Sequence, residues 1–402
     1  MIVTHLHEIP NEILLLILQE LHAKEMINIR LVSKYFYGFI RKEQWHHLFI
    51  RINDITKVQY IMHTYNFVNI DLSNTNITDL DLQIVGNCHK VNLSWCNLIT
   101  DIGLQYLVNC RKLNLAWCNL ITDIGLQHLV NCRELNLSHC MRITDAGLQY
   151  LKNCVKLNLT CCFLITDVGL QYLANCCALK LRACEGISDI GLQHLLNCQK
   201  LNLTGCSLVT DLGLKYLINC QKISLAHCDK ITDIGLGNLH NCCKLNLSWC
   251  KLISDKGLEH LMNCQETNLS CCNLITNKGL EHLTNCRKLI LTCCKLITDE
   301  GLQHLNCREL TLRGCDRITD IGLQYLVNCD KLDLSYCGLI KDEGLRYIKK
   351  CRVLNLSACN LITDIGLQYL MNCNKLDISY CNLITDIGLQ YLVNCDKLDI
   401  SY

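Results

Sequence analysis

The chain has 402 residues, half of them apolar, and its 38 basic and 37 acidic side chains give a formal charge of +1. This balance argues against a general polyanion binder, because nucleic-acid-binding proteins carry a basic excess. No run of about 20 apolar residues predicts a transmembrane helix, and the first residues, MIVTHLHEIPNE, lack the basic stretch and the cleavage site of a signal peptide. We therefore expect an intracellular protein, in the cytoplasm or the nucleus, with no membrane and no nucleic acid as partner.

Residues 1–50 differ from the rest of the chain and predict three helical elements. The first, EIPNEILLLILQEL, places Pro10, the one proline of the chain, at the start of a helix, where its missing N–H costs nothing. A second amphipathic helix is predicted over MINIRLVSKYFYGFI, and Trp45 and Leu48 follow on a third short element. A unit of this size is small for independent stability, so we expect it to pack against the segment that follows.

This N-terminal stretch resembles an F-box. The family pattern of Ile-Pro, Glu-Ile, an Ile-Leu pair, a Leu, the run Leu-Val-Ser-Lys and a late Trp is matched from Ile9 to Trp45. In the family, this module docks on the Skp adaptor of a cullin-RING ubiquitin ligase. The resemblance implies that adaptor contact, or support of that contact from the F-box core, falls to Ile9, Pro10, Ile13, Ile17, Leu21, Val32 and Trp45. The alternative is a small helical cap of another kind.

Residues 51–66, RINDITKVQYIMHTYN, contain no run of Gly, Pro or Ser. We therefore expect no flexible linker after the F-box. The segment is either a short connection or the start of the repeats that follow, and it is expected to join the two parts rigidly.

From residue 67 to residue 402 the chain repeats itself about every 22 residues, in roughly fifteen units. In the unit KLNLAWCNLITDIGLQHLVNCR, the alternation of Leu113 and Leu115 with polar or small neighbours predicts a short strand with one buried face. Thr122 and Asp123 are a helix-start signal. Apolar residues then follow at helical spacing at Ile124, Leu126, Leu129 and Val130.

One such unit cannot bury its apolar face alone, so the units must stack into a solenoid. Gly125 recurs in every later unit, and its small size would let neighbouring units approach closely. The pattern LxLxxC…ITDxGLxxL resembles the cysteine-containing leucine-rich repeat. The resemblance implies an α/β fold, a solenoid with a parallel sheet on its concave side and short helices outside. The first unit is degenerate, with Thr75 in place of the cysteine, as a capping unit would be.

The 34 cysteines keep step with the repeat. A secreted, disulfide-rich protein is the other reading of such a count, but cysteines such as Cys96, Cys118 and Cys140 are spaced 22 residues apart, which favours a packing role inside each unit. No CxxC pair exists, so we expect no metal site and no cofactor. Five cysteines stand outside the regular series, as exposed thiols or chance substitutions: Cys161, Cys177, Cys243, Cys271 and Cys293.

The outward strand positions predict a largely uniform lining of Asn, Ser and Thr, so the departures from it are informative. Exposed Trp, Tyr and Arg commonly anchor protein interfaces. The departures predict a substrate-binding surface on the concave face at Trp95, Trp117, Lys180, Arg182, Trp249, Arg313, Tyr336 and Tyr380. His139 and His227 share the row of rings, and the C-terminal end is more acidic through Asp333, Asp377 and Asp399. The alternative is that these rings only cover the edge between strand and turn.

An F-box followed by leucine-rich repeats is a known family architecture. The resemblance implies a substrate-recognition adaptor of an SCF-type (Skp-cullin-F-box) ubiquitin ligase, with a protein substrate and no chemistry of its own. Two alternatives stay open: a scaffold or decoy that binds the adaptor or other proteins without ubiquitination, and a repeat scaffold that the N-terminal helices merely cap. An enzyme is not expected, because the sequence has no P-loop, GxSxG or HExxH motif.

Overall fold

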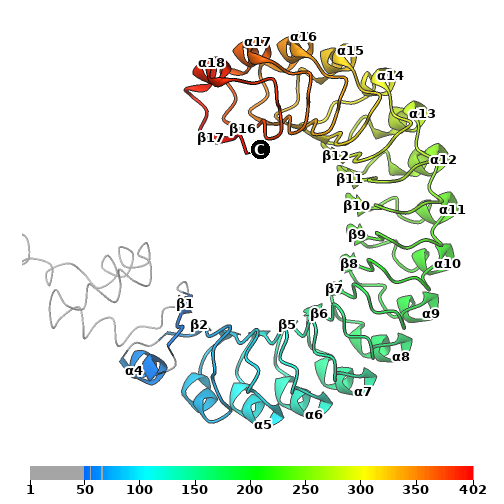
Figure 1. The fold of residues 1–402 in the computed structure, drawn as a ribbon. Coiled ribbons are helices and arrows are strands. Elements are labelled where there is room, and N and C mark those ends of the chain that lie inside the picture. Colours follow the sequence, from blue (N-terminus) through cyan, green and yellow to red (C-terminus); the bar gives the residue numbers. More distant parts are fainter. Residues whose placement is uncertain (1–48, 55, 65–66, 402) are drawn as a thin grey trace, which may run out of the picture. The chain divides into compact units, whose positions relative to one another are not determined.

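The computed structural model describes residues 49–54, 56–64 and 67–401 (Figure 1), and the chain divides into two units between Cys184 and Glu185. The helices predicted for residues 1–48 lie outside this range. In both units, strands line one side and short helices the other, so the predicted α/β leucine-rich-repeat solenoid is confirmed.

Each unit is built on parallel strands that pair in chain order. The first unit contains β1 (Ile50–Arg51), β2 (Asn69–Asp71), β3 (Lys90–Asn92), β4 (Lys112–Asn114), β5 (Glu134–Asn136), β6 (Lys156–Asn158) and β7 (Ala178–Lys180). The second contains β8 (Lys200–Asn202), β9 (Lys222–Ser224), β10 (Lys244–Asn246), β11 (Glu266–Asn268), β12 (Lys288–Ile290), β13 (Glu309–Thr311), β14 (Lys331–Asp333), β15 (Val353–Asn355), β16 (Lys375–Asp377) and β17 (Lys397–Asp399). Equivalent residues of neighbouring repeats lie opposite one another, as Leu113 and Leu135 do.

All the described helices except α4 are single turns. The first unit has α4 (Thr56–Thr64), α5 (Asp101–Leu104), α6 (Asp123–Leu126), α7 (Asp145–Leu148) and α8 (Asp167–Leu170). The second has α9 (Asp189–Leu192), α10 (Asp211–Leu214), α11 (Asp233–Leu236), α12 (Asp255–Leu258), α13 (Asn277–Leu280), α14 (Asp299–Leu302), α15 (Asp320–Leu323), α16 (Asp342–Leu345), α17 (Asp364–Leu367) and α18 (Asp386–Leu389). Apart from the longer α4, these helices are too short to be stable alone and depend on packing.

Tight 3-10 turns continue most of these helices. The turns that continue a helix are η3 (Gln105–Leu107), η4 (Gln127–Leu129), η5 (Gln149–Leu151), η6 (Gln171–Leu173), η7 (Glu259–Leu261), η8 (Glu281–Leu283), η9 (Gln324–Leu326), η10 (Arg346–Ile348), η11 (Gln368–Leu370) and η12 (Gln390–Leu392). In the repeat that starts with β2, η2 (Asp81–Val85) stands without an α-helix before it. Because the backbone tightens after one α-turn, the apolar face is narrower than predicted. Leu126 and Leu129 are buried, whereas Ile124 and Val130 are 68% and 40% exposed.

The helix start locks each repeat to the one before it. Thr122 accepts a hydrogen bond from the Ile124 N–H at 3.3 Å, as a helix cap does. The N–H and hydroxyl of the same threonine donate to the two carboxylate oxygens of Asp101, one repeat earlier, at 2.8 and 2.5 Å. A Cβ on Gly125 would lie 2.4 Å from Asp101 Oδ1, which explains why only glycine fits there and confirms the predicted close approach.

The regular cysteines pack inside the repeats, as predicted. Cys118 Sγ donates to the Leu93 carbonyl at 3.1 Å and Cys140 Sγ to the Leu115 carbonyl at 3.2 Å, so each thiol satisfies a backbone acceptor of an earlier repeat. Burial raises the pKa of Cys140 to about 12. Such thiols stay protonated and unreactive at neutral pH.

Candidate functional site

The side of the sheet opposite the helices is left open, and we call it the open face; it is the concave side of each unit (Figure 1). Three positions of each strand segment point toward it, for example Lys112, Asn114 and Ala116 on and after β4. A fourth position, occupied by Trp117 in this repeat, lies at the turn just before the inward cysteine. We call the fourth positions together the ring row.

The uniform polar lining supports turns. Asn114 Oδ1 accepts the Ala116 N–H at 3.1 Å, and Asn136 does the same for Ser138 at 3.0 Å. The lining asparagines therefore stabilise the chain reversal after each strand. Lys180 replaces this acceptor on β7, which marks that strand as different from its neighbours.

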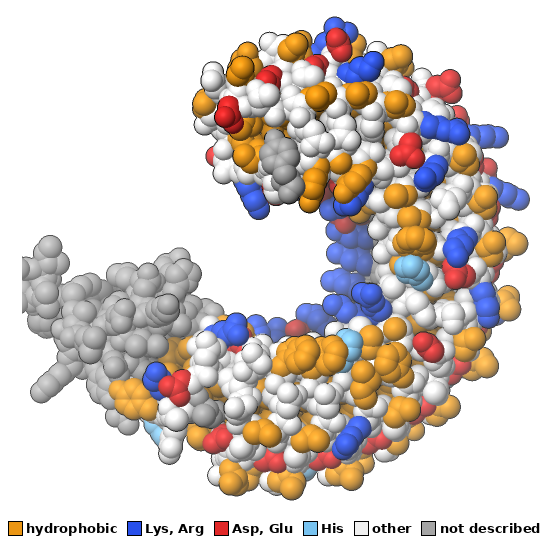
Figure 2. Space-filling view, viewed as in Figure 1, with side chains coloured by type: hydrophobic (Ala, Val, Ile, Leu, Met, Phe, Trp, Pro, Cys, Tyr) orange, Lys and Arg blue, Asp and Glu red, His pale blue; other side chains and the backbone are white. Residues whose placement is uncertain are grey.

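Three rings of the ring row are stacked in the first unit. The centroids of Trp95 and Trp117 lie 4.5 Å apart with their planes at 13°, and those of Trp117 and His139 lie 3.8 Å apart at 10°. Trp95 is 49% exposed and the other two are half-buried. Figure 2 shows hydrophobic side chains gathered along this edge of the first unit. The predicted residues Trp95 and Trp117 are thus brought into one continuous surface.

The backbone of the ring row is strained. Trp95, Trp117 and His139 have φ angles of 64°, 65° and 62°, in the left-handed region. This conformation costs an ordinary residue about 1–2 kcal/mol, and it suits glycine or asparagine. The chain uses those residues at the same position elsewhere, as Asn74 and Gly205. Cys161, Ala183 and Ala358 share this conformation, so the strain belongs to the turn of the repeat, and what distinguishes Trp95, Trp117 and His139 is the ring itself.

Two basic side chains lie near the stacked rings. Lys180 and Arg182, both predicted site residues, are exposed on and just after β7. In the described part of the chain neither has a carboxylate within ion-pair distance. Burial lowers the pKa of His139, and the charge of Arg182 lowers it further, so both effects favour the neutral ring.

The second unit holds the other four predicted residues in separate arrangements. Trp249 stacks on His227 at 5.5 Å, and the Arg313 guanidinium lies 4.9 Å from the centroid of the Tyr336 ring. Tyr380 is 52% exposed. Arg313 and Tyr336 therefore form a cation–π pair.

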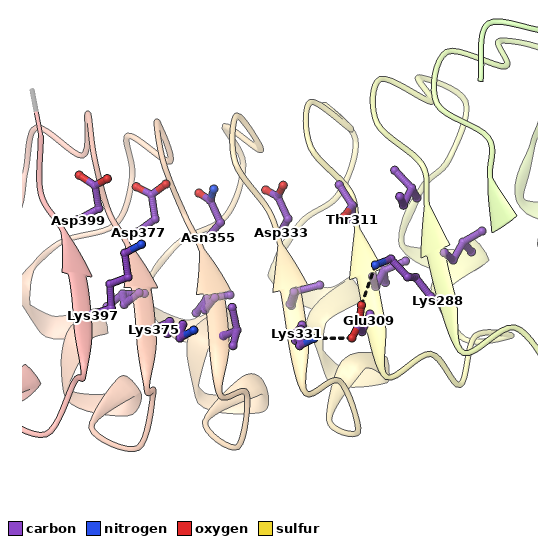
Figure 3. Close-up of a pocket in the computed structure, with 17 residues that line it drawn as sticks. Lys288, Glu309, Thr311, Lys331, Asp333, Asn355, Lys375, Asp377, Lys397 and Asp399 are labelled. Carbon is purple, nitrogen blue, oxygen red and sulfur yellow. Dashed lines mark hydrogen bonds and ion pairs between the residues drawn. The ribbon is translucent and has the colours of Figure 1, made fainter. Parts of the chain in front are cut away.

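A groove of about 450 Å³ runs over β12 to β17 on the open face (Figure 3). Along one side, Glu309 lies between Lys288 at 3.0 Å and Lys331 at 2.6 Å. Hydrogen bonds from Lys331 and Lys288 lower the pKa of this carboxyl. The other side is acidic through Asp333, Asp377 and Asp399 (Figure 3).

The lysine side of this groove was not predicted as part of a site. Its signal in the sequence is the lysine that opens most strands, as in KLD at Lys331, Lys375 and Lys397. Each acidic residue of the opposite side serves its own turn: Asp333 Oδ1 accepts the N–H and the hydroxyl of Ser335 at 2.9 and 2.6 Å. The groove thus presents rows of opposite charge on the same strands.

The predicted adaptor-binding residues, Ile9, Pro10, Ile13, Ile17, Leu21, Val32 and Trp45, lie outside the described residues. Over the range that is described, no group of three or more His, Cys, Asp or Glu side chains is placed to hold a metal ion. Nor is any helix in that range long and apolar enough to cross a membrane.

Two family models match the chain. The F-box-like model matches residues 6–51. The Leucine Rich repeat model matches residues 89–108, 111–130, 133–152, 244–262, 282–305, 331–349, 352–371 and 374–393. A search of curated proteins finds no match.

Two solved structures are similar to the chain. An internalin (inlF) from Listeria monocytogenes matches with a TM-score of 0.51 and 23% identity, over 87% of this chain and 94% of that one. The Rad7 and Elc1 complex of yeast matches with a TM-score of 0.46 and 16% identity, over 83% of this chain and 85% of that one. At such identity, the likeness to the internalin shows the fold alone.

Proposed function

Because this chain is an F-box/leucine-rich-repeat protein, we propose that it acts as the substrate-recognition adaptor of an SCF-type ubiquitin ligase. In this proposal the F-box of residues 1–50 docks on a Skp-type adaptor, residues 51–66 form the junction, and the repeats of residues 67–402 hold a protein substrate. The chain supplies no chemistry of its own. It raises the effective concentration of the substrate beside the transferred ubiquitin, inside the cell, in the cytoplasm or the nucleus.

The observation that carries the proposal is the direct continuation of the F-box-like sequence into the sheet. The match ends at residue 51, and Ile50–Arg51 already form β1, which pairs with β2. α4 then follows at Thr56–Thr64. This continuity supports the proposal of a short junction, and a short junction keeps the effective concentration high.

We assign substrate binding to the open face, where the residues that depart from the uniform lining are exposed or half-buried. They are Trp95, Trp117, Lys180, Arg182, Trp249, Arg313, Tyr336 and Tyr380. Aromatic and Arg side chains of this kind supply most of the binding energy in protein interfaces.

The adaptor role is tested by a pull-down of the full-length protein with a purified Skp-type adaptor. We expect wild type to bind, and the double variant Pro10→Ala/Ile13→Ala to bind at least tenfold more weakly, because the F-box resemblance assigns both side chains to the contact. The matched control is Ile102→Ala/Ile124→Ala, which removes two apolar side chains that are 66% and 68% exposed on α5 and α6. The control is expected to bind like wild type.

Absence of adaptor binding, or equal binding by the F-box variant, would contradict the proposal. Ubiquitination of a bound partner is the second readout. If the adaptor binds but deletion of residues 1–50 leaves ubiquitination of that partner unchanged, the chain is a decoy or scaffold instead.

A further inference from the structure

The open face of the first unit is basic although the whole chain is nearly neutral. On and just after β2 to β7, this face carries five cationic side chains and only two carboxylates. The cations are Lys90, Lys112, Lys156, Lys180 and Arg182, and the carboxylates are Asp71 and Glu134. Since the chain as a whole carries a charge of +1, this face holds a local excess of positive charge.

Both carboxylates are already engaged. Glu134 pairs with Lys112 at 3.1 Å and with Lys156 at 2.8 Å. Asp71 Oδ1 accepts the Ser73 N–H and the Asn92 side-chain amide, both at 2.9 Å. The excess charge is therefore carried by cations such as Lys180 and Arg182 that have no carboxylate partner among the described residues.

The ring stack adds hydrogen-bond donors to the same face. Trp117 has both ring faces covered, and Trp95 and His139 have one each, so the stack presents ring edges, the electropositive part of an aromatic ring, along its length. Neither indole N–H finds an acceptor in the part of the chain that the structure describes. Donors without acceptors and cations without anions both call for a partner rich in oxygen acceptors.

We propose that the open face of the first unit binds an acidic segment of a protein partner. The carboxylates of that segment pair with Lys180 and Arg182, and its backbone or side-chain oxygens accept hydrogen bonds from the edges of the ring stack. The surface from β3 to β7 spans four strand steps, about 19 Å, which matches about six residues in extended conformation. The inference rests on the proposed function in one respect: this acidic segment would belong to the substrate.

A protein segment fits this surface better than single-stranded nucleic acid. Proteins that bind single strands offer free ring faces on which bases stack, together with a long basic groove. Here four of the six ring faces are taken up by the stacking, and Lys112 and Lys156 share the charge of Glu134. The few remaining cations suit a short acidic segment.

The test is selection from a displayed library of random dodecapeptides on the purified full-length chain. We expect the selected peptides to be enriched in Asp and Glu. Lys180→Gln/Arg182→Gln should abolish the enrichment and weaken binding of the peptides selected on wild type at least tenfold. The control Arg142→Gln/Lys152→Gln removes two exposed cations of the same unit that lie outside the open face, and should leave both results unchanged.

The ring stack is tested with Trp117→Asn. Asparagine tolerates the left-handed backbone, as Asn74 does with a φ of 58°, so thermal stability should be kept while binding of the selected peptides falls at least tenfold. Unchanged peptide binding would show that the rings only cover the turn and would overturn their part in the site.

The proposal fails if the selected peptides are neutral or basic, or if the Lys180→Gln/Arg182→Gln variant selects the same acidic peptides. It also fails if a 20-residue oligothymidylate binds as tightly as the selected peptides. None of these measurements involves the Skp-type adaptor, so they stand whether or not the adaptor pull-down succeeds.

Discussion

At most helix starts a threonine makes two hydrogen bonds to the repeat before it and a third that caps its own helix. Thr363 donates its N–H and hydroxyl to Asp342 at 2.9 and 2.6 Å and accepts the Ile365 N–H at 3.2 Å. At α16 the threonine is replaced by Lys341, which keeps only the backbone bond to Asp320, at 2.8 Å, and gives no side-chain cap. One carboxylate oxygen of Asp320 thus lacks the hydroxyl donor that its counterparts have, and burial raises the pKa of this carboxyl.

Lys341→Thr is expected to stabilise the second unit by about 1 kcal/mol, because it restores a helix cap and a hydroxyl donor to Asp320. The increase is measured as a higher urea midpoint and as slower hydrogen exchange at α16. The reverse change in the next repeat, Thr363→Lys, is the matched control and should destabilise by a similar amount. A lower midpoint for Lys341→Thr would contradict the assigned role of the threonine.

The gain from Lys341→Thr should depend on pH. The pKa of Asp320 in the folded chain is raised above its ordinary value of 3.8. Below pH 3.8 this carboxyl is protonated in the folded and the unfolded chain and does not lower the free energy of unfolding. As the pH rises through the raised folded pKa, the carboxyl ionises in its buried site and the free energy of unfolding falls. A hydroxyl donor favours the charged form. The difference between variant and wild type should therefore be full at pH 7 and shrink toward pH 3.8, as measured by urea midpoints at several pH values.

At the scale of elements, neighbouring single-turn helices approach closely because each helix contains a glycine. A Cβ on Gly366 of α17 would lie 2.4 Å from Asp342 Oδ1 and 3.0 Å from Leu345 Cδ1. The same carboxylate holds Thr363, so it cannot move away without breaking that bond. The close packing of neighbouring helices therefore depends on the glycine and the Thr-Asp hydrogen bonds together.

Gly366→Ala is expected to destabilise the second unit by about 1–3 kcal/mol, as overpacking of a tight contact does. Gly338→Ala is the control in the same unit, since a Cβ there would meet nothing within 4 Å, and it should change stability by less than about 0.5 kcal/mol. Chemical denaturation of both variants checks the contrast. Equal effects of the two substitutions would show that close approach is not the reason for the glycine.

At the scale of the whole molecule, the regular cysteines link successive repeats, because their thiols donate hydrogen bonds to backbone carbonyls of an earlier repeat. All 34 cysteines lie within the described residues, and all but six are buried. Burial dominates the raised pKa of Cys140 and of Cys110, both about 12. The fold thus protects thiols that would be reactive in an unfolded chain.

Thiol labelling of the native chain with an alkylating reagent at pH 8 is expected to modify at most six cysteines. They are Cys161, Cys177, Cys243, Cys271, Cys293 and Cys395, the half-buried ones. Mass spectrometry after a short reaction identifies the sites, and the denatured chain, in which all 34 should react, is the control. Rapid labelling of Cys118 or Cys140 would contradict their buried place in the fold.

Much of the fold could be predicted from the sequence because it is local and repeated. The alternation around Leu113 fixes the strand, Thr122 fixes the helix start, and the recurring Gly125 indicates close approach. The prediction that Ile124 belongs to the buried helix face was wrong, because a helix of one turn followed by a 3-10 turn buries only a narrow face. The side chains that depart from the repeated lining can be recognised in the same way, because each departure is visible in the sequence itself.

The sequence by itself determined the order of the elements, the register of the repeats and the side chains that depart from the lining. Only the tertiary structure decided which of these side chains meet. Trp117 stacks on both Trp95 and His139, Glu134 is neutralised by two lysines, and Lys180 and Arg182 are left without an anion. The physical reason is that each of these contacts joins residues about one repeat apart, and its geometry depends on how the units stack. Periodicity shows that such residues are neighbours, but it does not show which polar or aromatic atoms satisfy one another.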